Sequence, residues 1–89
     1  MDRKTQKIIK ELAPRAAELQ SEMEALAERL RELYEGMEER MYERSEAWQE
    51  GPKGQALQED MDRLQELIDA AEDVGAGAER LSQACEGMA

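Results

Sequence analysis

The sequence contains no histidine and no phenylalanine, and its 89 residues include only one cysteine, one tryptophan and two prolines. Without histidine there is neither an imidazole base nor a histidine metal ligand, and Cys85 has no histidine to activate it as a nucleophile. The abundant carboxylates are spread along helical stretches, which offer no enclosed pocket for acid–base chemistry. We therefore expect a protein that is not an enzyme and that uses no metal and no cofactor.

Long apolar runs are also missing. No stretch approaches the roughly 18 residues needed to span a membrane, and residues 1–12 are too polar to form the core of a signal peptide. The single Cys85 cannot form an internal disulfide, which suits a reducing compartment. We expect a cytoplasmic protein without membrane contacts. A short chain that lacks large aromatic side chains buries little surface by itself, so a second copy of the chain is an expected partner.

Acidic residues outnumber basic ones by 22 to 12, which gives a net charge of −10. This charge disfavours direct binding to nucleic acid or to anionic membranes, but it allows a basic protein as a partner. The distribution is uneven, since residues 1–15 carry five bases and only two acids.

What the chain does contain is a heptad pattern. Its apolar residues recur at alternating steps of four and three, which indicates a long helix that packs along one edge. They are Leu12, Ala16, Leu19, Met23, Leu26, Leu30, Leu33 and Met37. We predict one helix over about residues 2–50, with a kink at Pro14. The alternative is a short helix that ends at Leu12, with Pro14 at the first position of the next helix.

Gly51 and Pro52 stop this helix, because glycine favours helix ends and proline cannot continue the hydrogen-bond ladder. A turn at about 51–53 then leads to a second helix over about 54–86. Its predicted seam is Leu57, Met61, Leu64, Leu67, Ala71, Val74, Ala78, Leu81, Cys85 and Met88. Because the register continues across Gly75 and Gly77, we interpret these glycines as a soft spot or a place of close packing.

Two long helices joined by a short turn predict a single all-α domain over residues 1–89, a coiled-coil-like antiparallel hairpin. The basic N-terminal segment should extend beyond the second helix. Because a hairpin covers only part of each seam, we expect two hairpins to pair into a four-helix bundle. The residues expected to form the core and the oligomer interface are Leu19, Met23, Leu26, Leu30, Leu33, Met37, Leu64, Leu67, Val74 and Leu81.

An acidic ladder follows the first predicted helix at steps of three and four, which places its members on one helix face. It comprises Glu24, Glu28, Glu32, Glu35, Glu39, Glu43, Glu46 and Glu50. The first interpretation is a solvated face opposite the apolar seam. The second is a mimic of a nucleic-acid backbone that binds a basic nucleic-acid-binding protein. The candidate partner face is then Glu28, Glu32, Glu35, Glu39, Glu43 and Glu46.

Three further residues lie near the predicted turn. Trp48 is interpreted either as a plug that closes the hairpin end or as an interface anchor. Arg40 and Arg44 occupy nominal core positions, where they either pair with acids of another helix or point outward.

Residues 43–73 resemble small acidic helical proteins of bacteriophages and related mobile elements, whose function is largely uncharacterised. The matching positions are Ser45, Glu46, Trp48, Gln49, Glu50, Lys53, Gly54, Gln58 and Glu59. Gly51-Pro52 departs from that pattern, where charged or small polar residues are more usual. The resemblance implies a bacterial host cytoplasm but no activity. The sequence predicts a non-enzymatic, oligomeric interaction protein; the alternatives are an acidic inhibitor of the anti-CRISPR or anti-restriction type and a phage assembly factor.

Overall fold

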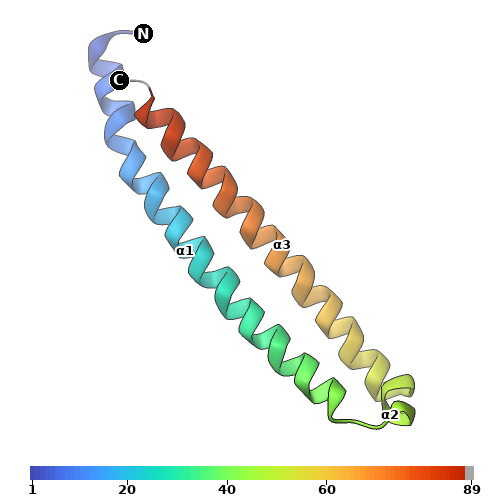
Figure 1. Ribbon diagram of the computed structural model, residues 1–89. Coiled ribbons are helices and arrows are strands. Elements are labelled where there is room, and N and C mark those ends of the chain that lie inside the picture. The colour runs from blue at the N-terminus through green and yellow to red at the C-terminus, as the bar shows by residue number, and fades with distance from the viewer. Residues whose placement is uncertain (88–89) are drawn as a thin grey trace.

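The computed structural model describes residues 1–87, which form three helices and no strands. They are α1 (Arg3–Tyr42), α2 (Glu46–Glu50) and α3 (Pro52–Glu86). Figure 1 shows α1 and α3 side by side and antiparallel, with the short α2 at the corner that joins them. The chain is a rod with extents of 67 × 16 × 12 Å. The predicted all-α helical hairpin is confirmed.

Helix α1 begins at a capping residue and continues through its proline. The Asp2 Oδ1 atom accepts a hydrogen bond from the Thr5 backbone N–H at 2.7 Å, which lowers the pKa of Asp2 below its usual value. Pro14 lies inside the helix with its ring exposed, so the alternative of two separate helices is wrong. The first turns of α1 extend past the end of α3, as expected (Figure 1).

The prediction of one helix to residue 50 is wrong, because α1 ends at Tyr42. Ser45 starts a new helix by accepting a hydrogen bond from the Trp48 N–H at 3.3 Å. The Gln49 side chain then donates to the carbonyl oxygens of Met41 and Arg44, each at 2.9 Å. The Met41 carbonyl also accepts from the Arg44 backbone N–H, so Gln49 adds a second hydrogen bond there and helps to hold the chain where α1 ends. The corner is therefore longer than the predicted turn at 51–53.

Gly51 and Pro52 act together at the start of α3. Gly51 is the N-cap residue and Pro52 occupies the first turn, where its missing N–H removes no helical hydrogen bond. Two residues later, buried Gly54 lies directly against the backbone of Gln49, where a Cβ atom would clash. This close approach fixes α2 on the first turn of α3.

The interior of the hairpin consists largely of small residues. Three residues of α1 are buried: Ala13, Ala16 and Ala27. Nine residues of α3 are buried: Gly54, Met61, Leu64, Ile68, Ala71, Gly75, Ala78, Ser82 and Cys85. The buried Ser82 hydroxyl donates to the Ala13 carbonyl oxygen at 3.2 Å, so this polar group is satisfied. The two helices therefore approach closely around a thin core.

This interior corrects the predicted seam of the second helix. Leu67, Val74 and Leu81 do not face α1, and the residue after each of them does: Ile68, Gly75 and Ser82. The seam from Met61 to Cys85 keeps its heptad spacing, but it takes these inward positions. At Gly75 and Ser82 the physical reason is size, because closely packed helices leave room for glycine and serine where a leucine would hold them apart. Ile68 is as large as Leu67, and it is buried because it lies on the side of α3 that faces α1. The last predicted seam residue, Met88, lies outside the described residues.

Candidate interaction surfaces

Besides Ile8, which lies near the start of α1, seven large aliphatic side chains remain substantially exposed along the hairpin. We call them the leucine face: Leu12, Leu19, Leu26 and Leu33 of α1, with Leu67, Val74 and Leu81 of α3. Their exposed fractions lie between 44% and 55%. Within each helix they recur every seven residues, which places them on one side of that helix.

An apolar groove shows that the two sets share the same side of the rod. It has a volume of about 340 Å³, and its lining residues come from both helices. They are Met23, Leu26, Leu30, Leu67, Ala70, Ala71 and Val74. An exposed apolar surface that continues across two helices is typical of a protein interface.

The ten residues predicted as core and oligomer seam thus divide into three groups. Six are exposed members of the leucine face: Leu19, Leu26, Leu33, Leu67, Val74 and Leu81. Met23, Leu30 and Met37 are half-buried, and only Leu64 is buried. Leu26 and Leu67, which were predicted to lie in the core or the oligomer interface, are thus not covered within one hairpin. Sequence reasoning also missed Ala13 and Ala27, which occupy the interior instead.

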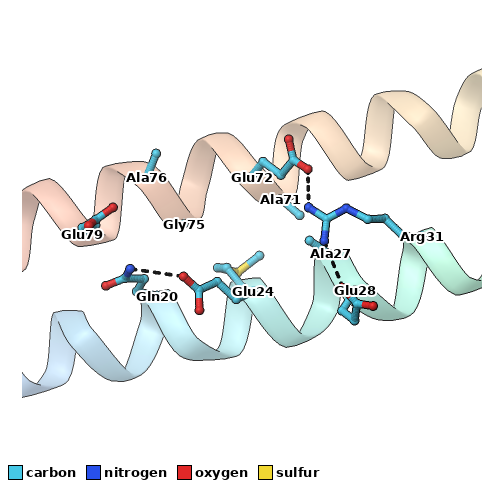
Figure 2. A pocket seen from close by; sticks show the side chains of 11 residues that line it. Gln20, Glu24, Ala27, Glu28, Arg31, Ala71, Glu72, Gly75, Ala76 and Glu79 are labelled. Atoms are coloured by element: carbon cyan, nitrogen blue, oxygen red, sulfur yellow. Dashed lines mark hydrogen bonds and ion pairs between the residues drawn. The ribbon is translucent and has the colours of Figure 1, made fainter.

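The other side of the same helix pair is polar. We call it the acidic face: Glu24, Glu28, Glu35 and Glu38 of α1, with Glu72 and Glu79 of α3. Its central part is a groove of about 360 Å³ floored by Ala27, Ala71 and Gly75. Figure 2 shows Arg31 extending from α1 across this groove to Glu72.

Arg31 is the charged link between the two helices. Its guanidinium donates hydrogen bonds to Glu72 on α3 and, at 3.3 Å, to Glu28 on α1. The contact with Glu72 is the main reason that the pKa of Arg31 is raised above its usual value. Since water reaches all three side chains, the contacts orient Arg31 more than they stabilise the fold.

The acidic ladder is interrupted by the corner. Glu28, Glu32, Glu35 and Glu39 lie exposed on α1, but Glu43 is its C-cap residue and Glu46 belongs to α2. The prediction that all eight carboxylates share one helix face is therefore wrong. Two of those on α1 are paired with arginines, Glu28 with Arg31 and Glu32 with Arg29 at 2.9 Å. The acidic ladder available for nucleic-acid mimicry is therefore shorter than predicted, and arginines partly neutralise its charge.

The corner holds the remaining predicted site residues. Trp48 is half-buried in α2, and the Arg44 guanidinium carbon lies 5.0 Å from the centre of its ring. Arg40, in the last turn of α1, points outward. All three line one cavity with residues of α3. Of the two interpretations of the arginines, the outward orientation is the one found.

Among the described residues, no group of three Cys, Asp or Glu side chains is arranged to hold a metal ion. No helix in residues 1–87 has the length and apolar character needed to cross a membrane. Comparison of the chain with protein-family models, with curated proteins and with solved structures found no match.

Proposed function

We propose that this protein is a self-associating interaction module, in which the leucine face of one hairpin packs against the leucine face of a second copy to form a four-helix bundle. The observation that carries this proposal is the seven-residue repeat of half-exposed aliphatic side chains on the same side of both helices. It acts by binding rather than by catalysis. The proposed setting, a bacterial cytoplasm during phage infection, rests on the sequence resemblance alone.

The energy available supports a second copy as the occupant. Full burial of a leucine contributes about 1.5–3 kcal/mol, so covering the exposed half of one contributes roughly 1 kcal/mol. Fourteen such side chains in two copies contribute roughly 14 kcal/mol. That sum lies in the upper part of the estimated cost of association, about 4–15 kcal/mol. Direct contacts between the two copies add to it.

The hairpin itself needs such a partner. Its interior is thin and built mainly from alanine, glycine and serine, which bury little apolar area when two helices fold together. Small domains of this kind usually gain stability by association. A second hairpin presents the same spacing of leucines, so pairing would bury the apolar side chains that one chain leaves exposed.

Sedimentation equilibrium at protein concentrations from about 1 to 100 µM tests this proposal. We expect a concentration-dependent mass that approaches twice the chain mass of 10.1 kDa. Circular dichroism on the same samples reports the helix content. A fully helical protein that keeps the mass of one chain at the highest concentration would refute self-association.

A second candidate function concerns the acidic face. Carboxylates from both helices line it, and it remains open when the leucine face is covered. We propose it as the surface for a basic protein partner, the type of contact that a nucleic-acid mimic makes. Glu24→Gln combined with Glu79→Gln should weaken capture of a basic partner, mainly by lowering the association rate. If this variant captures the basic partner as well as the unmodified protein does, the acidic face is not its binding surface.

A further inference from the structure

The corner of the hairpin contains a shallow cavity, open to solvent, that belongs to neither the leucine face nor the acidic face. It has a volume of about 310 Å³, at the lower end of the range for small-molecule sites. Its lining comes from α1, the linker, α2 and α3: Arg40, Arg44, Trp48, Lys53, Ala56, Leu57 and Asp60. Four consecutive segments thus converge on one small volume.

Three bases surround this cavity in a chain whose net charge is −10. Among residues 1–87 none of the three forms an ion pair with a carboxylate. Arg40 donates only to the Gly36 carbonyl oxygen at 3.4 Å, and Arg44 lies over the Trp48 ring. Asp60 is the one acid in the lining, which leaves an excess of two positive charges.

The walls of the cavity add a flat apolar surface to these charges. Trp48 and Leu57 are half-buried there, and stacking on the indole ring limits the freedom of the Arg44 guanidinium. A guanidinium held in this way can donate two parallel hydrogen bonds to a carboxylate or phosphate. The aromatic ring beside it can pack against a planar group on the same molecule.

We propose that the corner cavity binds a small organic anion, in which a carboxylate or phosphate is attached to a planar apolar group. Arg40, Arg44 and Lys53 bind the anionic group, and Trp48 with Leu57 contacts the planar part. A long polyanion is disfavoured, because the acidic remainder of the chain repels it outside this small basic site. The proposal does not depend on self-association.

Trp48 is the only tryptophan, so its indole N–H gives one separate signal in a ¹⁵N-correlated NMR spectrum of the full chain. We would follow this signal while titrating phenyl phosphate and, separately, benzoate. Inorganic phosphate tests the anion without a ring, and benzyl alcohol tests the ring without a charge. The two aromatic acids distinguish phosphate from carboxylate as the preferred group.

Three variants locate the binding. Arg40→Gln and Lys53→Gln remove bases from the lining, whereas Arg63→Gln removes an exposed base of α3 that does not line the cavity. Arg44 is left in place, since its loss would alter the indole signal directly. Circular dichroism confirms that each variant keeps its helix content.

We expect saturable binding of at least one aromatic acid, at least about tenfold tighter than either single-feature probe, and about tenfold weaker in the Arg40 and Lys53 variants. The Arg63 variant should bind like the unmodified protein. Non-saturating shifts with both acids, or equal affinities in all three variants, would overturn the proposal. Neither result would alter the sedimentation test of self-association.

Discussion

The leucine face and the acidic face flank the same interior, yet they differ in every physical property. On one side, leucines of α1 and aliphatic residues of α3 recur every seven residues and remain about half exposed. On the other side, equivalent lateral positions carry glutamates and Arg31. Both faces are open in the single hairpin. Exposure to water is unfavourable for the apolar side chains of the leucine face and not for the charged side chains of the acidic face, and this difference supports the proposal that a second copy covers the leucine face.

The comparison also explains the small residues between the two faces. If leucines filled the interior, the hairpin would bury its own apolar surface and have little reason to associate. With alanine and glycine inside, the helices lie close together and their leucines form a second layer at the side. This second layer is the surface that the proposed four-helix bundle would bury.

The largest effect is expected from charges on the leucine face. Leu26→Asp combined with Leu67→Asp places two carboxylates at the edge of the apolar groove, where a second copy would have to desolvate them. We expect the dissociation constant of the dimer to rise by more than about 100-fold. Sedimentation equilibrium measures this change.

The matched control changes the opposite side. Glu24→Gln with Glu79→Gln on the acidic face should leave the dissociation constant within about threefold. Because aspartates in α1 and α3 also weaken the helices, Leu26→Ala with Leu67→Ala provides a milder test that keeps helix propensity. Self-association that is equally strong in all of these variants would show that the leucine face is not the interface.

Two buried glycines test how closely the segments pack, Gly75 in the interior between the two faces and Gly54 at the corner. A Cβ atom at Gly54 would meet the Gln49 backbone, which cannot move without displacing α2. A Cβ atom at Gly75 would lie 3.6 Å from the Met23 Cβ atom, an ordinary contact distance. We expect Gly54→Ala to lower the free energy of unfolding by about 1–3 kcal/mol, and Gly75→Ala to raise it by up to about 1 kcal/mol.

Urea unfolding followed by circular dichroism, at one fixed protein concentration, measures both glycine variants. A destabilising Gly75→Ala would mean that the helices lie closer together than this spacing indicates. A neutral Gly54→Ala would mean that α2 is free to move away from α3.

A third test enlarges the interior itself. Ala27 is buried between the two faces, and Ala25, two residues earlier on α1, is exposed. Ala27→Leu should lower the free energy of unfolding by about 1–3 kcal/mol, because the extra atoms force the helices apart. Ala25→Leu has nearly the same helix propensity and should change it little. Equal stability of the two variants in urea would contradict a tightly packed interior.

The smallest effect is expected on the acidic face. Arg31→Gln removes the contacts to Glu28 and Glu72, but all three side chains are partly exposed to water, which weakens such ion pairs. We expect neither the urea midpoint nor the dissociation constant of the dimer to change measurably. A clear loss of stability would assign Arg31 a structural role in holding α1 against α3, and would weaken the contrast between the two faces.

Much of the fold was predictable from local sequence. The heptad spacing from Leu12 to Met37 predicted the long first helix, and Gly51-Pro52 predicted the start of the second. The early end of α1 was missed because the acidic and apolar periodicities continue through residues 43–45. The available signal was Ser45, a good N-cap residue three positions before Trp48.

The candidate surfaces were predictable only in part. The ten seam residues included six of the seven members of the leucine face, but their division between interior and surface was not foreseen. Four of the seven members of the leucine face are followed by a small buried residue, as with Leu26 before Ala27 and Val74 before Gly75. From hydrophobicity alone we expect the leucine to be buried. Two closely packed helices instead bury the alanine, because only a small side chain fits between them. The corner cavity was not predicted, since it depends on the corner conformation that brings Lys53 near Arg40.

By itself, the sequence determined that this chain is helical, that it reverses direction near Gly51, and that its apolar residues follow a heptad repeat. Those properties depend on the helix propensity of each residue and on the 3.6-residue period of the helix, and both can be read from residues that are close together in the sequence. The tertiary structure decided which of two adjacent heptad positions faces inward, and therefore which side chains remain on the leucine face. That choice depends on the distance between two helices, a quantity set by how all their contacting side chains fit together.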